Sequence, residues 1–195
     1  MGGTARLLRL VFALGLVVAE AACGFRPLYG RHGASGVAVA QLETVAIEPV
    51  DTVANRDRSG LLLQNTDRIG QQLRNHLYER MTPKGLPQHP RYTLEVQLST
   101  RTDNLGIRKD ASATRANLVV SAKIYLRTID SDRKSYLFLE TLRSVASYNL
   151  LDAQYATVTS QRDAEERATR QLADDITNRL ATYFSQAQTP GSKKP

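Results

Sequence analysis

Two segments of the chain repeat apolar residues about every four positions, which places them along one side of an α-helix. In residues 59–81 this stripe contains Leu62, Ile69, Leu73, Leu77 and Met81. In residues 161–186 it contains Ala164, Ala168, Leu172, Ile176, Leu180 and Phe184. Ser59 is a candidate N-cap, and Pro83 followed by Gly85 predicts the end of the first segment. We therefore predict two amphipathic helices, each with one buried side.

Four other segments have the pattern of β-strands. Residues 91–101 and 117–128 alternate apolar and polar side chains, which is typical of strands with one buried face. The apolar positions are Tyr92, Leu94, Val96, Leu98, Leu118, Val120, Ala122, Ile124 and Leu126. Residues 42–50 and 135–148 predict two further strands, and the polar stretch 103–115 predicts a loop between the second and third strands.

The predicted order of elements is strand, helix, three strands, helix. Each helix has one apolar side and the sheet has one apolar face, so burying all of them requires two layers. The sequence therefore predicts an α+β fold, a two-layer sandwich with two helices packed on one face of a four-stranded, largely antiparallel sheet.

The first 22 residues have the features of an export signal. Arg6 and Arg9 precede the ten-residue apolar run Leu10–Ala19, and small residues then lead to Cys23, the single cysteine of the chain. The run is too short to span a bilayer, which takes about 20 residues. Cys23 is therefore predicted to carry a lipid anchor. The alternative is cleavage at the Ala-Glu-Ala run just before it, which releases a soluble protein beginning at Ala22.

These features divide the chain into four parts. Residues 1–22 are predicted to be the signal peptide, and residues 23–36 the lipidated N-terminus with a flexible spacer, because residues 31–36 have the composition of a linker. Residues 37–188 are predicted to form a single α+β domain, and residues 189–195 a disordered tail.

Composition restricts the classes of function. The chain has 26 Lys and Arg against 19 Asp and Glu, a formal net charge of +7, which suits an anionic partner such as lipid head groups, lipopolysaccharide or an acidic protein surface. Export and the lack of a nucleic-acid motif argue against nucleic acid. His32, His76 and His89 are scattered, so we predict no metal site. The sequence contains no nucleophile elbow, phosphate loop or zinc-protease motif, so we predict no catalytic residues, no cofactor and no enzyme activity.

Four cations gather around the predicted loop between the second and third strands. They are Arg101, Arg108, Lys109 and Arg115, with Asp103 and Asp110 as partial counter-charges. Cations at the end of a sheet can bind phosphate groups, and arginine can do so with two hydrogen bonds. The alternative is that this basic loop is simply solvated.

The run Cys-Gly-Phe-Arg-Pro-Leu-Tyr-Gly at residues 23–30 resembles the mature N-terminus of LptE-type lipopolysaccharide-assembly lipoproteins, particularly their alphaproteobacterial branch. Two later segments agree with this resemblance. One is Ile107–Asn117, where a loop enters a strand, and the other is Tyr155-Ala156-Thr157 before the last helix. The order of the predicted elements also matches, so the resemblance covers nearly the whole mature chain.

This resemblance implies a role without catalysis. Proteins of this family partner the outer-membrane barrel LptD, sit inside it as a plug, and help to deliver lipopolysaccharide to the outer leaflet. The resemblance thus implies a lipid-anchored protein on the periplasmic side of the outer membrane, with lipopolysaccharide as the expected ligand of Arg101, Arg108, Lys109 and Arg115. Two alternatives remain: a soluble periplasmic binding module for an anionic ligand, and a structural lipoprotein of another envelope complex.

Overall fold

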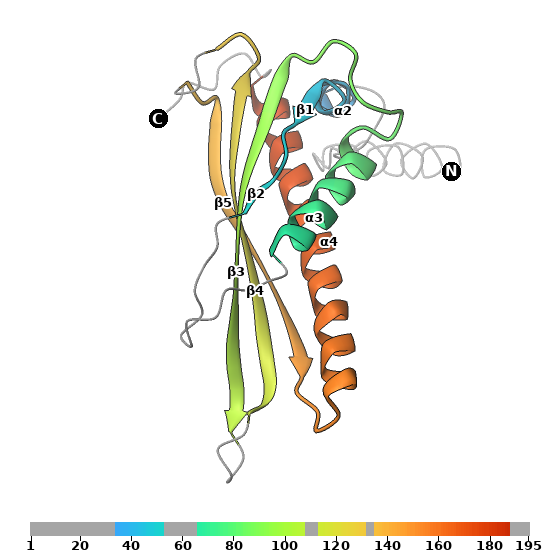
Figure 1. Ribbon diagram of the computed structural model, residues 1–195. Helices are drawn as coiled ribbons and strands as arrows, with labels where there is room; N and C mark the ends of the chain where they lie inside the picture. The colour runs from blue at the N-terminus through green and yellow to red at the C-terminus, as the bar shows by residue number, and fades with distance from the viewer. Residues whose placement is uncertain (1–33, 53–65, 108–112, 132–134, 188–195) are drawn as a thin grey trace, which may run out of the picture.

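The computed structural model describes residues 34–52, 66–107, 113–131 and 135–187 of the chain (Figure 1). Its helices are α2 (Ala34–Leu42), α3 (Thr66–Met81) and α4 (Gln154–Gln186). Its strands are β1 (Val45–Ile47), β2 (Asp51–Thr52), β3 (Tyr92–Ile107), β4 (Ala113–Thr128) and β5 (Phe138–Asn149). The predicted signal peptide, the anchor Cys23, the N-cap Ser59 and the tail 189–195 lie outside the described residues.

The strands form one mostly antiparallel sheet. Its order is β1-β3-β4-β5, and β2 also pairs with β3, beyond β1. The β3–β4 and β4–β5 pairs are antiparallel, whereas β1 and β2 run parallel to β3. The parallel pairing follows from α3, because a helix between two strands brings the chain back to start the second strand at the same end. The predicted α+β sandwich is confirmed, although the first strand of the sheet is two short pieces.

Helices α3 and α4 lie on the same side of the sheet (Figure 1). Both predicted stripes are buried against it, and the most enclosed of these side chains, all at 0% exposure, include Leu73, Leu77, Leu172, Ile176 and Leu180. They meet the even-numbered residues of β3 and β4, such as Leu94 and Ile124, which are equally buried. The period of four in the helices and of two in the strands therefore describes one shared core. The odd-numbered residues of β3, β4 and β5 form the opposite surface, which we term the open face.

The hairpin between β3 and β4 is longer than the sequence predicts. β3 continues to Ile107 and β4 begins at Ala113, so most of the expected loop 103–115 is paired strand. The polar residues there pair across the hairpin: Asp103 lies opposite Asn117, and Leu105 opposite Arg115. Here the prediction was wrong because a strand that projects with exposed sides has no need for apolar alternation, so its polar residues resemble a loop.

Helix α4 also begins earlier than predicted, at Gln154 instead of Gln161. Residues 154–160 are rich in β-branched and hydroxyl residues, which have modest helix propensity. In the structure, hydroxyl groups bond inside the helix: Thr159 Oγ1 donates to the Tyr155 carbonyl at 3.0 Å, and Ser160 Oγ to the Thr157 carbonyl at 3.4 Å. These bonds satisfy polar groups that would otherwise favour a loop.

The N-terminal boundary of the domain differs as well. Helix α2 begins at Ala34, inside the segment 23–36 expected to be a flexible spacer, and its Leu42 was expected to start a strand. Ala38 and Leu42, one helical turn apart, are 0% and 3% exposed. Their burial in the core explains why a short, glycine-containing segment is helical. The remaining domain boundaries stay predictions.

The two main helices differ in length, and this shapes the molecule. α4 has 33 residues and so extends for about 50 Å, whereas α3 has 16 and extends for about 24 Å. The parallel pairing of β2 with β3 ends at Leu98. Beyond this point β3, β4, β5 and the first half of α4 continue as a narrower arm (Figure 1). Its far end, the distal end, carries the β3–β4 and β5–α4 connections.

Candidate functional site

The distal end of the arm brings together residues that are far apart in sequence. Leu105 of β3, Arg115 of β4 and Asn149 of β5 are register partners and form one row across the open face. The Leu150 amide donates to the Thr114 carbonyl at 3.0 Å, which extends the pairing by one step. The start of α4 is joined to the same place, because Ser160 Oγ donates to the Asn149 carbonyl at 2.9 Å. The distal end is therefore a fixed structure built by β3, β4, β5 and α4.

Large apolar side chains are exposed at this end. Tyr155 is 85% exposed, Leu151 51%, Leu105 41% and Val158 40%. Thr157 holds the turn that presents them, since its Oγ1 accepts the Leu151 amide at 2.8 Å and lies 3.0 Å from the Leu151 carbonyl. Sequence reasoning noted Tyr155 but not this cluster, because it takes the β5–α4 turn to place these residues near Leu105.

The structure separates the four predicted cations. Arg115 is exposed and makes no ion pair among the described residues. Arg101 is also exposed, but its guanidinium donates to both carboxylate oxygens of Asp103, at 2.9 and 3.0 Å. Arg108 and Lys109 lie outside the described residues. At the distal end Arg115 is thus a free cation beside exposed apolar groups, whereas Arg101 is already compensated.

Sequence reasoning missed two further free cations on the open face. Lys123 of β4 and Arg143 of β5 are both exposed, and neither pairs with a carboxylate within the described part of the chain. The pKa of Lys123 is raised, first by its hydrogen bond to Tyr125 and then by the electrostatic interaction with it. The signal was present in the sequence, because both residues occupy the strand positions that alternate with the apolar ones.

A polar cluster is buried where α3 meets α4. Glu165 is only 1% exposed, accepts a hydrogen bond from Arg68 and accepts a second from Gln161 Nε2 at 3.1 Å. Nearby, the pKa of Tyr148 is raised, mainly by burial, which disfavours its phenolate. Both Glu165 oxygens are thus held by α3 and α4 themselves, which is the arrangement of a structural ion pair.

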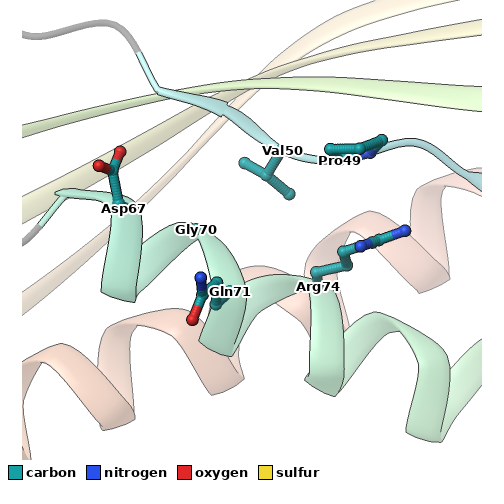
Figure 2. A pocket seen from close by; sticks show the side chains of 6 residues that line it. All are labelled: Pro49, Val50, Asp67, Gly70, Gln71 and Arg74. Atoms are coloured by element: carbon teal, nitrogen blue, oxygen red, sulfur yellow. The ribbon is translucent and has the colours of Figure 1, made fainter.

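One hollow, of about 250 Å³, lies between α3 and the β1–β2 connection. Figure 2 shows its lining side chains, Pro49 and Val50 on one side and Asp67, Gln71 and Arg74 on the other, with Gly70 between. Its charged groups are engaged: Thr52 Oγ1 donates to Asp67 at 2.6 Å, and Arg74 donates to the Ile47 carbonyl at 3.4 Å.

Gly70 explains the close approach of the chain at this hollow. A Cβ atom there would lie 3.1 Å from Thr52 Cγ2, tighter than ordinary van der Waals contact. The small residue lets β2 pack against α3, so the hollow is a seam between two elements.

Two chemical possibilities can be assessed directly. Within the described ranges, no group of three or more His, Cys, Asp or Glu side chains is arranged to hold a metal ion. None of the helices in the described part of the chain combines the length and the hydropathy needed to cross a membrane.

Comparisons with known proteins agree with this architecture. The model of the LptE lipopolysaccharide-assembly family matches residues 42–180. A crystal structure of a candidate lipoprotein from Caulobacter crescentus CB15 has a TM-score of 0.53 at 22% identity, and the match covers 78% of this chain and 98% of that one. No curated protein sequence matches the chain.

Two other solved structures are less similar. A minor lipoprotein from Acinetobacter baumannii has a TM-score of 0.47 at 17% identity, covering 72% of this chain and 94% of that one. Rare lipoprotein B from Shewanella oneidensis has a TM-score of 0.45 at 10% identity, covering 74% and 98%. The fold comparison therefore rests on the Caulobacter structure, and the family assignment on the sequence match. That match extends from the end of α2 almost to the end of α4, and the chain belongs to the LptE lipopolysaccharide-assembly family.

Proposed function

We propose that this chain is a lipid-anchored outer-membrane protein that partners an LptD-like barrel and helps to assemble lipopolysaccharide in the outer leaflet. The observation that carries the proposal is the family match over residues 42–180, which includes every described strand and most of α4. The proposed role needs no catalytic group: the protein acts by binding its partner and its ligand.

The distal end is the proposed contact with lipopolysaccharide. This ligand has phosphate groups next to acyl chains, so a site for it needs cations beside apolar side chains. Arg115 supplies a free cation, and Leu105, Leu151 and Tyr155 supply exposed apolar surface close to it. The tip residues Arg108 and Lys109 add two positive charges to the same hairpin. Arg101 contributes less, because binding a phosphate requires it to leave Asp103.

The ligand contact leads to a first prediction. Changing Arg108, Lys109 and Arg115 to Glu together should weaken lipopolysaccharide binding by at least about tenfold, since each desolvated charged contact is worth about 1–3 kcal/mol. Higher salt should weaken binding of the wild type as well. The measurement is a binding titration with purified lipopolysaccharide on folded protein. The matched control is Arg167→Glu with Arg170→Glu on the exposed side of α4, which should bind as the wild type does. Equal loss in both variants would remove the distal end from the proposal.

The anchor gives a second prediction. If Cys23 is the processed N-terminus, its thiol and amine carry acyl chains, and the mature protein sediments with outer membranes. Mass spectrometry of the N-terminal peptide from the native envelope checks this. A mature chain that begins at Ala22 with an unmodified thiol would show plain secretion instead, and Cys23→Ser would then leave the location unchanged.

Partnership with the barrel is tested by affinity capture. The tagged full-length protein, purified in mild detergent from envelope membranes, should retain an LptD-like barrel as a stable component. If a different envelope complex is recovered reproducibly and no barrel, the protein is a structural lipoprotein of that complex and the proposed function is wrong.

A further inference from the structure

The molecule has two broad surfaces with different charge. Helices α3 and α4 together contain seven Arg against seven Asp and Glu, a balance of zero. The open face contains five cations against two carboxylates, a balance of +3. These residues are Arg101, Arg115, Lys123, Arg127 and Arg143 against Glu95 and Asp103. Positive charge is thus concentrated on the side of the sheet that α3 and α4 leave uncovered.

The outer surface of the helices is compensated within itself. Arg167 pairs with Asp163 at 2.8 Å and Arg170 with Glu166 at 2.5 Å, while Arg80 pairs with Asp174 between the two helices. Among the described residues of α3, and of α4 after Val158, no large hydrophobic side chain is exposed. Such a surface is stable in contact with water and offers a partner little to bury.

The open face has the opposite properties. Leu139 and Val145 of β5 are each 50% exposed, and Tyr136 just before β5 is 41% exposed. Tyr136 packs on Tyr125, with ring centroids 4.9 Å apart, and Lys123 lies 5.2 Å from the centre of the Tyr125 ring. Exposed aliphatic and aromatic groups bordered by free cations are typical of a surface that another molecule covers.

The polar groups of this face are also held in place. Tyr125 donates to Gln97 at 3.2 Å, Gln97 donates to Glu95 at 3.3 Å, and Ser147 donates to Asn117 at 2.7 Å. Side chains fixed in this way lose little entropy when a partner docks. Three strands with the length of β5 present about 40 Å by 15 Å, or about 600 Å², close to the roughly 800 Å² that one partner contributes to a standard interface.

We infer that the open face of the sheet is the surface that docks against the barrel partner, and that it meets an acidic protein surface there. The inference rests on the proposed function, because it assigns a face to that partnership. Leu139, Val145 and Tyr136 supply the apolar contact, and Lys123 and Arg143 supply the charges that the acidic surface neutralises. Helices α3 and α4 face away from this contact.

Paired charge reversals test the inference. The open-face variant carries Lys123→Glu and Arg143→Glu, and the control carries Arg167→Glu and Arg170→Glu on α4, so both change the net charge equally. Each full-length protein is co-expressed with the LptD-like barrel, and the barrel captured per mole of protein is measured at low and high salt. The open-face variant should capture at least about tenfold less barrel, because like charges then oppose each other across the contact. The control should capture as much as the wild type.

A crosslinking experiment gives an independent readout that charge reversal cannot disturb. A photoreactive amino acid at position 139 should crosslink to the barrel, and the same group at position 171 on α4 should not. Crosslinks from position 171 alone, or equal capture by both reversal variants, would overturn the assignment of the face while wild-type capture preserves the proposed function. If the open-face variant loses lipopolysaccharide binding but keeps the barrel, the face binds glycolipid and the inference is wrong. No capture by the wild type would overturn both.

Discussion

Replacing Leu73 or Ile176 with aspartate is expected to abolish the folded domain. Both side chains are 0% exposed and belong to the layer between the helices and the sheet. An unpaired carboxylate there loses its hydration without a compensating partner, and this cost exceeds the 5–15 kcal/mol by which domains of this kind are typically stable. Circular dichroism should show no cooperative thermal transition for either variant.

Milder substitutions keep this prediction measurable. Leu73→Ala should reduce the free energy of unfolding by about 2–5 kcal/mol, because it leaves a cavity that the core cannot fill. The controls Gln71→Asp and Gln171→Asp place the same charge on the exposed sides of α3 and α4, where a change within about 0.5 kcal/mol is expected. A wild-type melting curve for Leu73→Asp would contradict the core described here.

The core was predictable because burial imposes a period on the sequence. Every described member of the two helical stripes is buried, and so are Leu94, Val96 and Leu98, the apolar side chains predicted to line one face of β3. The two layers follow from these periods alone. The parallel pairing of β1 and β2 did not, since no local pattern records which strand a three-residue segment joins.

The arm was less predictable for a physical reason. Residues 102–107 and 113–117 project beyond α3, so few of them need to be apolar, and their polar composition resembles that of a loop. The candidate site shares this difficulty. Arg101 and Arg115 were identified by charge, but only the geometry shows that Asp103 neutralises one and that Leu105 and Tyr155 lie near the other.

Two surfaces therefore have different proposed tasks on one rigid sheet. The distal end combines a free cation with exposed apolar groups, and the open face presents further cations along the same strands. β4 contributes to both, since Arg115 and Lys123 stand on the same side of it, eight residues or about 27 Å apart. Reversal of one cation at a time should consequently affect the ligand and the barrel separately.

The second large effect is expected from Arg68, which joins α3 to the buried Glu165 of α4. Arg68→Ala leaves this carboxylate, at 1% exposure, with Gln161 as its remaining printed-length donor at 3.1 Å. Breaking a buried pair typically costs 3–5 kcal/mol, and we expect about 3 kcal/mol because Arg68 itself is 39% exposed.

Urea denaturation measures this loss against Arg167→Ala, which breaks the exposed pair with Asp163 and should cost less than about 1 kcal/mol. The double variant Arg68→Met with Glu165→Leu separates the unpaired charge from lost packing. Replacing both partners by apolar residues of similar size removes the buried charge, so this variant should regain most of the stability lost in Arg68→Ala. A double variant as unstable as Arg68→Ala would show that α3 and α4 depend on the ion pair itself, in which case its geometry sets how the two helices dock.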